Sequence, residues 1–158
     1  MKTCDLVDHY QDIIQVAKTI GLRHYGGLIS FSGQIQTIQC VDDNSLIKQT
    51  LSTSGDKRVL VVDAGGSMNC ALMGDVIARL AVSNNWSGVV INGCIRDSLA
   101  MSKLNLGVLA LGTNPQRSAK EFKGIVGESL QFAGVQFVPG QYLYADEDGF
   151  LVSPKALT

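Results

Sequence analysis

The sequence predicts an α/β domain whose centre is a strand, a glycine-rich loop, a helix and a second strand within residues 58–97. Val59–Val62 is a run of branched apolar residues without a polar break, which is typical of a strand covered on both faces. Gly88–Ile91 has the same character, and apolar residues recur at helical spacing within 76–81. Such a unit usually makes a right-handed crossover between parallel strands.

Four charged residues in this segment are candidate site residues. The two strands of a crossover end at the same edge of the sheet, where open α/β sheets bind their ligands. Charge is rare here, so Asp63, Asp75, Arg96 and Asp97 stand out.

Composition limits the class of protein. The chain has 158 residues, enough for one domain with a substantial core, and 46% of them are apolar while only 17% are charged. This low charge favours some surface being buried in an oligomer. A net charge of -1 without a basic run argues against direct contact with nucleic acid or an anionic membrane. Four scattered cysteines, acids near the N-terminus and the lack of a long apolar run indicate a cytoplasmic protein without disulfides.

The N-terminal part is expected to be rich in β-structure. A short helix follows Thr3, and strands at Leu28–Phe31 and Gln34–Val41 are expected to pair across a turn at Ser32–Gly33. His24 lies beside a glycine turn, where a hydrogen-bonding role is commoner than a catalytic one.

The remaining elements follow from capping and turn residues. Asp42–Ser45 should open a helix, and the helix dipole explains its two acids without a metal ion. After the central segment we expect a helix at Ser98–Lys103 and a strand at Val108–Leu111. A strand at Gln131–Val138 with a bulge at Gly134 follows, and then a hairpin of Gln141–Ala145 and Phe150–Val152.

The glycine-rich loop after the first central strand does not fit a nucleotide site. Gly65 and Gly66 are adjacent, and the helix begins only near Gly74, so the spacing differs from a dinucleotide-binding Gly-x-Gly-x-x-Gly. No Gly-Lys-Ser/Thr is present, which excludes a P-loop.

The candidate binding and metal-ligand residues lie at the start of the central helix and at the end of the second strand. Free N–H groups from Gly74 to Ile77 could receive a substrate carboxylate, although Asp75 could be only a helix-start acid. Arg96 offers a planar fork for a carboxylate, and Asp97 is a hard oxygen ligand suited to Mg²⁺ or Mn²⁺. An Arg–Asp pair could equally be a surface ion pair, but the combination with Asp75 favours a site.

The segment GDVIARLAVSNNWSGVVINGCIRD closely resembles the RraA-like family, which includes regulators of ribonuclease activity and class II 4-hydroxy-4-methyl-2-oxoglutarate aldolases. The resemblance extends over nearly the whole chain, through LVDHY, GGLISFSGQIQTIQC, RVLVVDAGGS and GQYLYADEDGFLVS. It implies that residues 1–158 form a single swivelling β/β/α domain, phosphohistidine-domain-like, with mixed sheets and flanking helices. It also implies a ring-shaped homotrimer with sites between subunits.

For the aldolases of this family, the resemblance implies roles for particular residues. Asp97 corresponds to the ligand of the divalent metal, Mg²⁺ or Mn²⁺, and Arg96 to the residue that contacts the substrate. The amides of Gly74, Asp75, Val76 and Ile77 correspond to the cradle for the pyruvate carboxylate, and Asp75 to an acid in the proton-transfer network. The implied reaction is cleavage of 4-hydroxy-4-methyl-2-oxoglutarate or a related diacid to pyruvate, with oxaloacetate decarboxylation as a side activity.

The same family implies an alternative function, because some members bind and inhibit the endoribonuclease RNase E. The best-known of these looks to lack the Asp of the Arg-Asp pair, which this sequence retains at Asp97. Longer enzymes of the family place a further carboxylate from an extended C-terminus into the neighbouring subunit's site, and we expect this chain to lack it.

Overall fold

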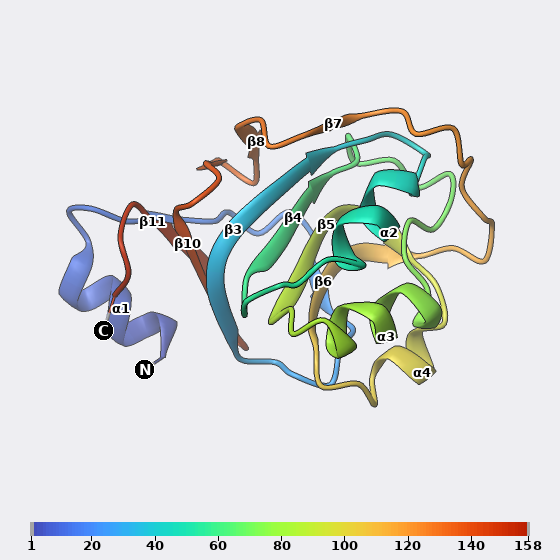
Figure 1. Cartoon of the computed structure of the whole chain (residues 1–158). Helices are drawn as coiled ribbons and strands as arrows, with labels where there is room; N and C mark the ends of the chain where they lie inside the picture. The colour runs from blue at the N-terminus through green and yellow to red at the C-terminus, as the bar shows by residue number, and fades with distance from the viewer. Residues whose placement is uncertain (1, 158) are drawn as a thin grey trace.

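The computed structural model describes residues 2–157, and over this range the main feature is a nine-stranded mixed sheet (Figure 1). Four neighbouring strands at its centre run parallel to one another. They are β3 (Phe31–Gln39), β4 (Val59–Asp63), β5 (Gly88–Ile95) and β6 (Gly107–Thr113). The strands therefore follow one another across the sheet in chain order.

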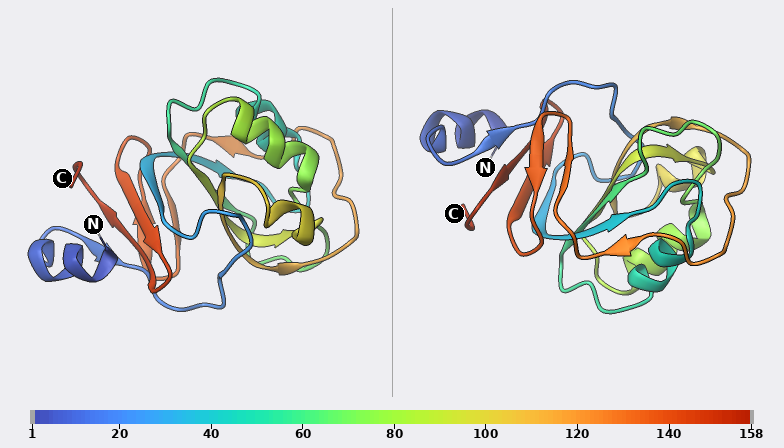
Figure 2. Two further views of the ribbon diagram at one scale, coloured as in Figure 1. Left: turned by 90° about the horizontal axis from the view of Figure 1, so that it is seen from below. Right: turned by 90° about the horizontal axis from the view of Figure 1, so that it is seen from above.

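Each connection between these strands contains a helix on the same face of the sheet (Figures 1 and 2). The helices are α2 (Ser45–Leu51), α3 (Asp75–Ser83) and α4 (Ser98–Met101). They share one hydrophobic core with the sheet, so the predicted parallel crossover between β4 and β5 is confirmed. Within residues 2–157, every helix is too short or too polar to span a bilayer.

Antiparallel strands extend the sheet on both sides, which confirms the predicted mixed sheet with flanking helices. Helix α1 (Thr3–Tyr10) lies apart from the other helices, against the strands of the C-terminal hairpin (Figure 2). The strands beyond β3 are β10 (Tyr142–Asp146), β11 (Gly149–Ser153) and β1 (Gln15–Val16); β2 (Arg23–His24) pairs with β6, and β7 (Ile125–Val126) pairs with β3.

The central strands are covered on both faces, as the apolar run in the sequence predicts. Leu60 and Val62 belong to the core under the helices, whereas Val59 and Val61 face a second core. That second core includes a separate hairpin of β8 (Leu130–Phe132) and β9 (Val135–Phe137). All four residues of Val59–Val62 are completely buried, so a polar side chain anywhere in the run would lose its water without gaining a partner.

The prediction of a hairpin around Ser32–Gly33 is wrong, because Phe31–Gln39 forms one continuous strand. Its first half pairs with β10 and its second half with β4, so the strand links the two parts of the sheet. A Cβ at Gly33 would lie 2.2 Å from the backbone oxygen of Lys57. The glycine therefore permits close contact with a distant segment, where the sequence suggested a turn.

The prediction of one bulged strand over Gln131–Val138 is also wrong. The segment turns back on itself at Ala133 and Gly134, whose φ angles are 53° and 71°. Two successive positive φ angles match the twist of a two-residue hairpin, which β8 and β9 form. Alternating apolar residues look the same in one strand and in two short strands, so the pattern could not reveal the turn.

Asp146 anchors helix α1 to the C-terminal hairpin. This side chain is buried and accepts hydrogen bonds from the backbone N–H and the hydroxyl of Thr3, both at 2.7 Å, and from the backbone N–H of Asp148 at 3.0 Å. Burial alone raises the pKa of Asp146, but the hydrogen bonds from Thr3 and Asp148 outweigh it and hold the pKa below its ordinary value.

We predict that Asp146→Asn lowers the free energy of unfolding at neutral pH by about 1–3 kcal/mol, because a charge-assisted acceptor is lost. Since the folded-state pKa is depressed, the contribution of Asp146 is complete above its unfolded pKa of about 3.9 and is lost as the pH falls through the lower folded value. Urea unfolding at neutral and acidic pH measures both effects, with the exposed Asp12→Asn as control. An equal acid dependence in wild type and Asp146→Asn would contradict the assignment.

Candidate functional site

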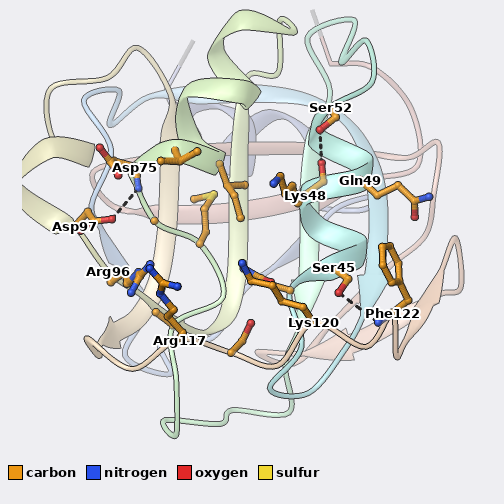
Figure 3. Close-up of a pocket in the computed structure, with 17 residues that line it drawn as sticks. Ser45, Lys48, Gln49, Ser52, Asp75, Arg96, Asp97, Arg117, Lys120 and Phe122 are labelled. Carbon is orange, nitrogen blue, oxygen red and sulfur yellow. Dashed lines mark hydrogen bonds between the residues drawn. The ribbon is translucent and has the colours of Figure 1, made fainter.

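A cavity of about 590 Å³ lies at the carboxyl ends of the parallel strands (Figure 3). It is bordered by α2, by the loop that leads into α3, by the residues after β5 and by the loop after β6. Its volume is typical of small-molecule sites, which range from about 300 to 1,000 Å³. Open α/β sheets bind ligands at this edge, so the cavity lies where the topology predicts a site.

The structure brings the predicted site residues together in this cavity. Its lining includes the helix-start segment Gly74–Ile77 together with Arg96 and Asp97. Asp63 is not part of it, because its carboxylate accepts hydrogen bonds from the backbone N–H of Gly65 at 2.9 Å and from the amide of Asn92 at 3.1 Å. It therefore stabilises the strand end.

Asp97 reaches across to the first turn of α3. Strand β5 extends to Ile95, further than predicted, so Arg96 and Asp97 follow it directly. The backbone of Asp97 is left-handed, with φ 56° and ψ 41°, which is uncommon for a residue other than glycine and is found often at functional sites. One oxygen of its carboxylate accepts a hydrogen bond from the backbone N–H of Asp75 at 3.1 Å.

Gly74 leaves the space that this carboxylate occupies. Its φ of -115° and ψ of -168° are extended, so the conformation itself does not require glycine. A Cβ at this position would lie 2.6 Å from Oδ2 of Asp97. The glycine is therefore needed for contact with Asp97.

Asp75 is held by an ion pair with Arg79, one helical turn further along α3. The hydrogen bond from Arg79 holds the pKa of Asp75 below its ordinary value. Asp75 is therefore ionised at neutral pH. Arg79 was not among the predicted site residues, although its spacing of four residues from Asp75 is typical of a helical ion pair.

The carboxylate oxygens in the cavity fit a hard divalent cation whose remaining ligands are mostly water or substrate. No group of three or more His, Cys, Asp or Glu side chains among residues 2–157 could hold a metal by itself. Asp97 and Asp75 offer two neighbouring carboxylates, and Mg²⁺ commonly takes one or two while keeping several waters. Carboxylate ligands also suit Mn²⁺.

Three cations of the lining were missed by the sequence analysis: Lys48, Arg117 and Lys120. Arg117 and Lys120 lie in the loop after β6, so the rule that parallel strands end at one edge could have identified them. Lys48 lies on the exposed side of α2, where a lysine is ordinary, and the sequence contains no signal for its role.

The other acids and the histidine considered in the sequence have structural partners. Asp42 accepts a hydrogen bond from the Ser67 hydroxyl at 2.6 Å, and Asp43 accepts one from the backbone N–H of Ser45 at 3.0 Å. The Nε2 atom of His24 is hydrogen-bonded to the backbone oxygen of Asp146 at 2.8 Å. None of these three side chains lines the cavity.

We predict that Gly74→Ala lowers the free energy of unfolding by up to about 1 kcal/mol, because the added methyl group displaces the Asp97 carboxylate from its hydrogen bond with the backbone N–H of Asp75. The same substitution should cost much less in an Asp97→Ala background, where the overlapping oxygen is absent. A double-mutant cycle from urea unfolding measures this coupling. Additive effects of the two substitutions would show that Gly74 does not make room for Asp97.

Comparison with known proteins agrees with this architecture. The family described as "RraA-like: Aldolase/RraA" matches residues 3–152. A protein from Dechloromonas aromatica is 48% identical over 99% of this chain and 98% of its own length, and one from Acinetobacter baylyi is 49% identical over 98% and 94%. Each is named "Putative 4-hydroxy-4-methyl-2-oxoglutarate aldolase".

Two solved structures are closely similar in fold. One, from Geobacillus kaustophilus, is described as an S-adenosylmethionine:2-dimethylmenaquinone methyltransferase; it has a TM-score of 0.97 and 44% identity, over 99% of this chain and 97% of that one. The other is the RNA-processing inhibitor RraA from Thermus thermophilus, with a TM-score of 0.95 and 39% identity over 100% and 95%. The chain therefore belongs to the RraA-like family.

Proposed function

We propose that this protein is a divalent-metal-dependent lyase that cleaves 4-hydroxy-4-methyl-2-oxoglutarate or a related 4-hydroxy-2-oxo diacid to pyruvate. Oxaloacetate decarboxylation is the expected side activity. The observation that carries the proposal is the placement of Asp75, Arg96 and Asp97 around the first turn of α3 within one cavity. The names of relatives at 48% and 49% identity support the same reaction class.

The first turn of α3 can receive the carboxylate of the pyruvyl part. The backbone N–H of Ala78 is the first to bond to a backbone oxygen within the helix, that of Gly74, so those of Val76 and Ile77 have no backbone acceptor there. Two N–H groups and the positive end of the helix dipole match the two oxygens of a carboxylate. With its carboxylate bound there, the substrate would have its neighbouring 2-oxo group on the side of Asp97 and Arg96, which line the same cavity.

The reaction breaks the bond between C3 and C4 of the substrate. The C4 hydroxyl loses its proton and becomes a carbonyl, while the electron pair forms the enolate of pyruvate, which then takes a proton at C3. Asp75 is ionised and is the group in the cavity that can accept the hydroxyl proton, directly or through water. The guanidinium of Arg96 can stabilise the negative charge that develops on the 2-oxo oxygen.

A divalent cation held by Asp97 would supply Lewis-acid polarisation of the 2-oxo group. Oxaloacetate leads to the same enolate, because loss of CO₂ leaves the electron pair on C3. Decarboxylation requires no hydroxyl proton to be removed, so it depends on Arg96 and Asp97 and needs no proton acceptor at Asp75.

We predict that the protein with Mg²⁺ or Mn²⁺ releases pyruvate from oxaloacetate faster than the metal alone. Asp97→Ala should reduce this excess by more than about 100-fold. Replacing a residue that only orients a metal ligand lowers metal affinity or activity by about 10- to 100-fold, and replacing the ligand itself should lower it further. Coupling pyruvate release to lactate dehydrogenase measures the rate, with Asp12→Ala as control. A rate equal to that of free metal would overturn the lyase proposal.

A second candidate function is binding and inhibition of RNase E. It is favoured by the close structural likeness to the RNA-processing inhibitor from Thermus thermophilus. The two functions need not share a surface, because a protein partner does not require the cavity.

We predict that the chain retains the arginine-rich, unstructured part of RNase E in a pull-down at low salt, and that Asp97→Ala retains it equally well. The substitution changes one exposed side chain that lines the cavity and leaves the rest of the surface unchanged. Absence of retention at low salt would remove this candidate, while retention lost in Asp97→Ala would place the partner at the cavity.

A further inference from the structure

The cavity is lined by more positive than negative side chains. The side of the cavity opposite the N-terminus of α3 has no carboxylate among the residues described. Arg96, Lys48, Arg117 and Lys120 line it, against Asp75 and Asp97. The ion pairs formed within residues 2–157 involve other cations: Lys2, Arg79 and Lys123. Unpaired like charges around a concave surface repel one another, and an anionic ligand would relieve the repulsion.

Two of these cations, Lys48 and Lys120, lie across the cavity from the acids (Figure 3). In Figure 3, Asp75 and Asp97 are at one side, and Lys48 and Lys120 extend inward from the other. The α3 N-terminus belongs to the acidic side, because Asp75 is its first residue. A ligand bound at that helix would therefore direct its opposite end toward the lysines.

The fold holds the two lysines in place through the buried Asp43. Its two carboxylate oxygens accept hydrogen bonds from the backbone N–H of Ser45 at 3.0 Å and from that of Glu121 at 2.6 Å. Lys48 is one turn along α2 from Ser45, and Lys120 directly precedes Glu121. One carboxylate thus fastens the loop after β6 to the start of α2 and brings Lys48 and Lys120 to the same wall.

Further hydrogen bonds reinforce this junction. The backbone N–H of Asn44 donates to the oxygen of Ala119 at 3.3 Å, and the N–H of Ala119 donates to the oxygen of Asp42 at 2.9 Å. The N–H of Phe122 donates to the Ser45 hydroxyl at 3.3 Å. The backbone on either side of Lys120 is therefore fixed to α2, as a binding site for a small anion requires.

We propose that Lys48 and Lys120 bind the second carboxylate of the substrate, the one at C5. The inference rests on the proposed function, which places the first carboxylate at the N-terminus of α3. The C5 group belongs to the part of the molecule that leaves as a second 2-oxo acid. The consequence is specificity: this cavity selects 2-oxo diacids over 2-oxo acids that end in a methyl group.

Binding of two non-cleavable acids tests the proposal. 2-Oxoglutarate and 2-oxopentanoate share a five-carbon 2-oxo skeleton, lack the C4 hydroxyl needed for cleavage, and differ only in a terminal carboxylate or methyl group. Isothermal titration calorimetry in the presence of Mg²⁺ should give a dissociation constant at least about tenfold lower for 2-oxoglutarate. The preference should shrink as salt is raised, because the cations are exposed.

The variant Lys48→Met/Lys120→Met should bind 2-oxoglutarate about tenfold or more weakly and bind 2-oxopentanoate as the wild type does. Lys57→Met/Lys123→Met removes the same charge outside the cavity and should keep the wild-type preference. The proposal is overturned if Lys48→Met/Lys120→Met still prefers 2-oxoglutarate as the wild type does. It is also overturned if Lys57→Met/Lys123→Met loses that preference to the same extent.

The outcomes also separate this inference from the proposed function. Equal binding of the two acids by the wild type would overturn the role of the lysines and leave the lyase proposal standing. Binding of neither acid would also overturn the role of the lysines. Pyruvate release from oxaloacetate, measured independently, reports on the lyase alone.

Discussion

Burial of both faces of the parallel strands is the constraint on which the rest of the structure depends. Helices cover one face of β4 and the β8–β9 hairpin covers the other, so this strand carries no polar side chain before its last residue, Asp63. The charged residues Arg96 and Asp97 likewise follow the end of β5. Because β3 to β6 are parallel, their carboxyl ends meet at one edge, and the cavity forms there.

The cavity itself depends on a few tightly defined positions. A left-handed backbone at Asp97 turns its carboxylate toward α3, and the absence of a side chain at Gly74 leaves room for it. Arg79 keeps Asp75 ionised beside it. These features place two negative charges together at a helix N-terminus, where the dipole offsets part of their repulsion. The remaining repulsion favours a cation between them.

Members of one fold can carry different functions, and the relatives of this chain have diverse names. Proteins of closely similar fold are named as aldolases, as an RNA-processing inhibitor and as a methyltransferase. The fold alone does not choose among them. The side chains in the cavity are more informative, because neighbouring carboxylates, Arg96 and a wall of unpaired lysines together match a small dianionic acid bound with a metal.

The sequence by itself determined the α/β class, the central crossover and the C-terminal hairpin, because these rest on runs of apolar residues and on local turn signals. It also identified Gly74–Ile77, Arg96 and Asp97, which line the same cavity, since a crossover brings its strand ends to one edge of the sheet. Only the tertiary structure decided what depends on distant contacts. Gly33 lies within a strand because it contacts the backbone of Lys57, and Lys48 and Lys120 line the same cavity because the buried Asp43 joins their segments. Periodicity records which face of an element is buried, but it contains no information about which distant segment covers that face.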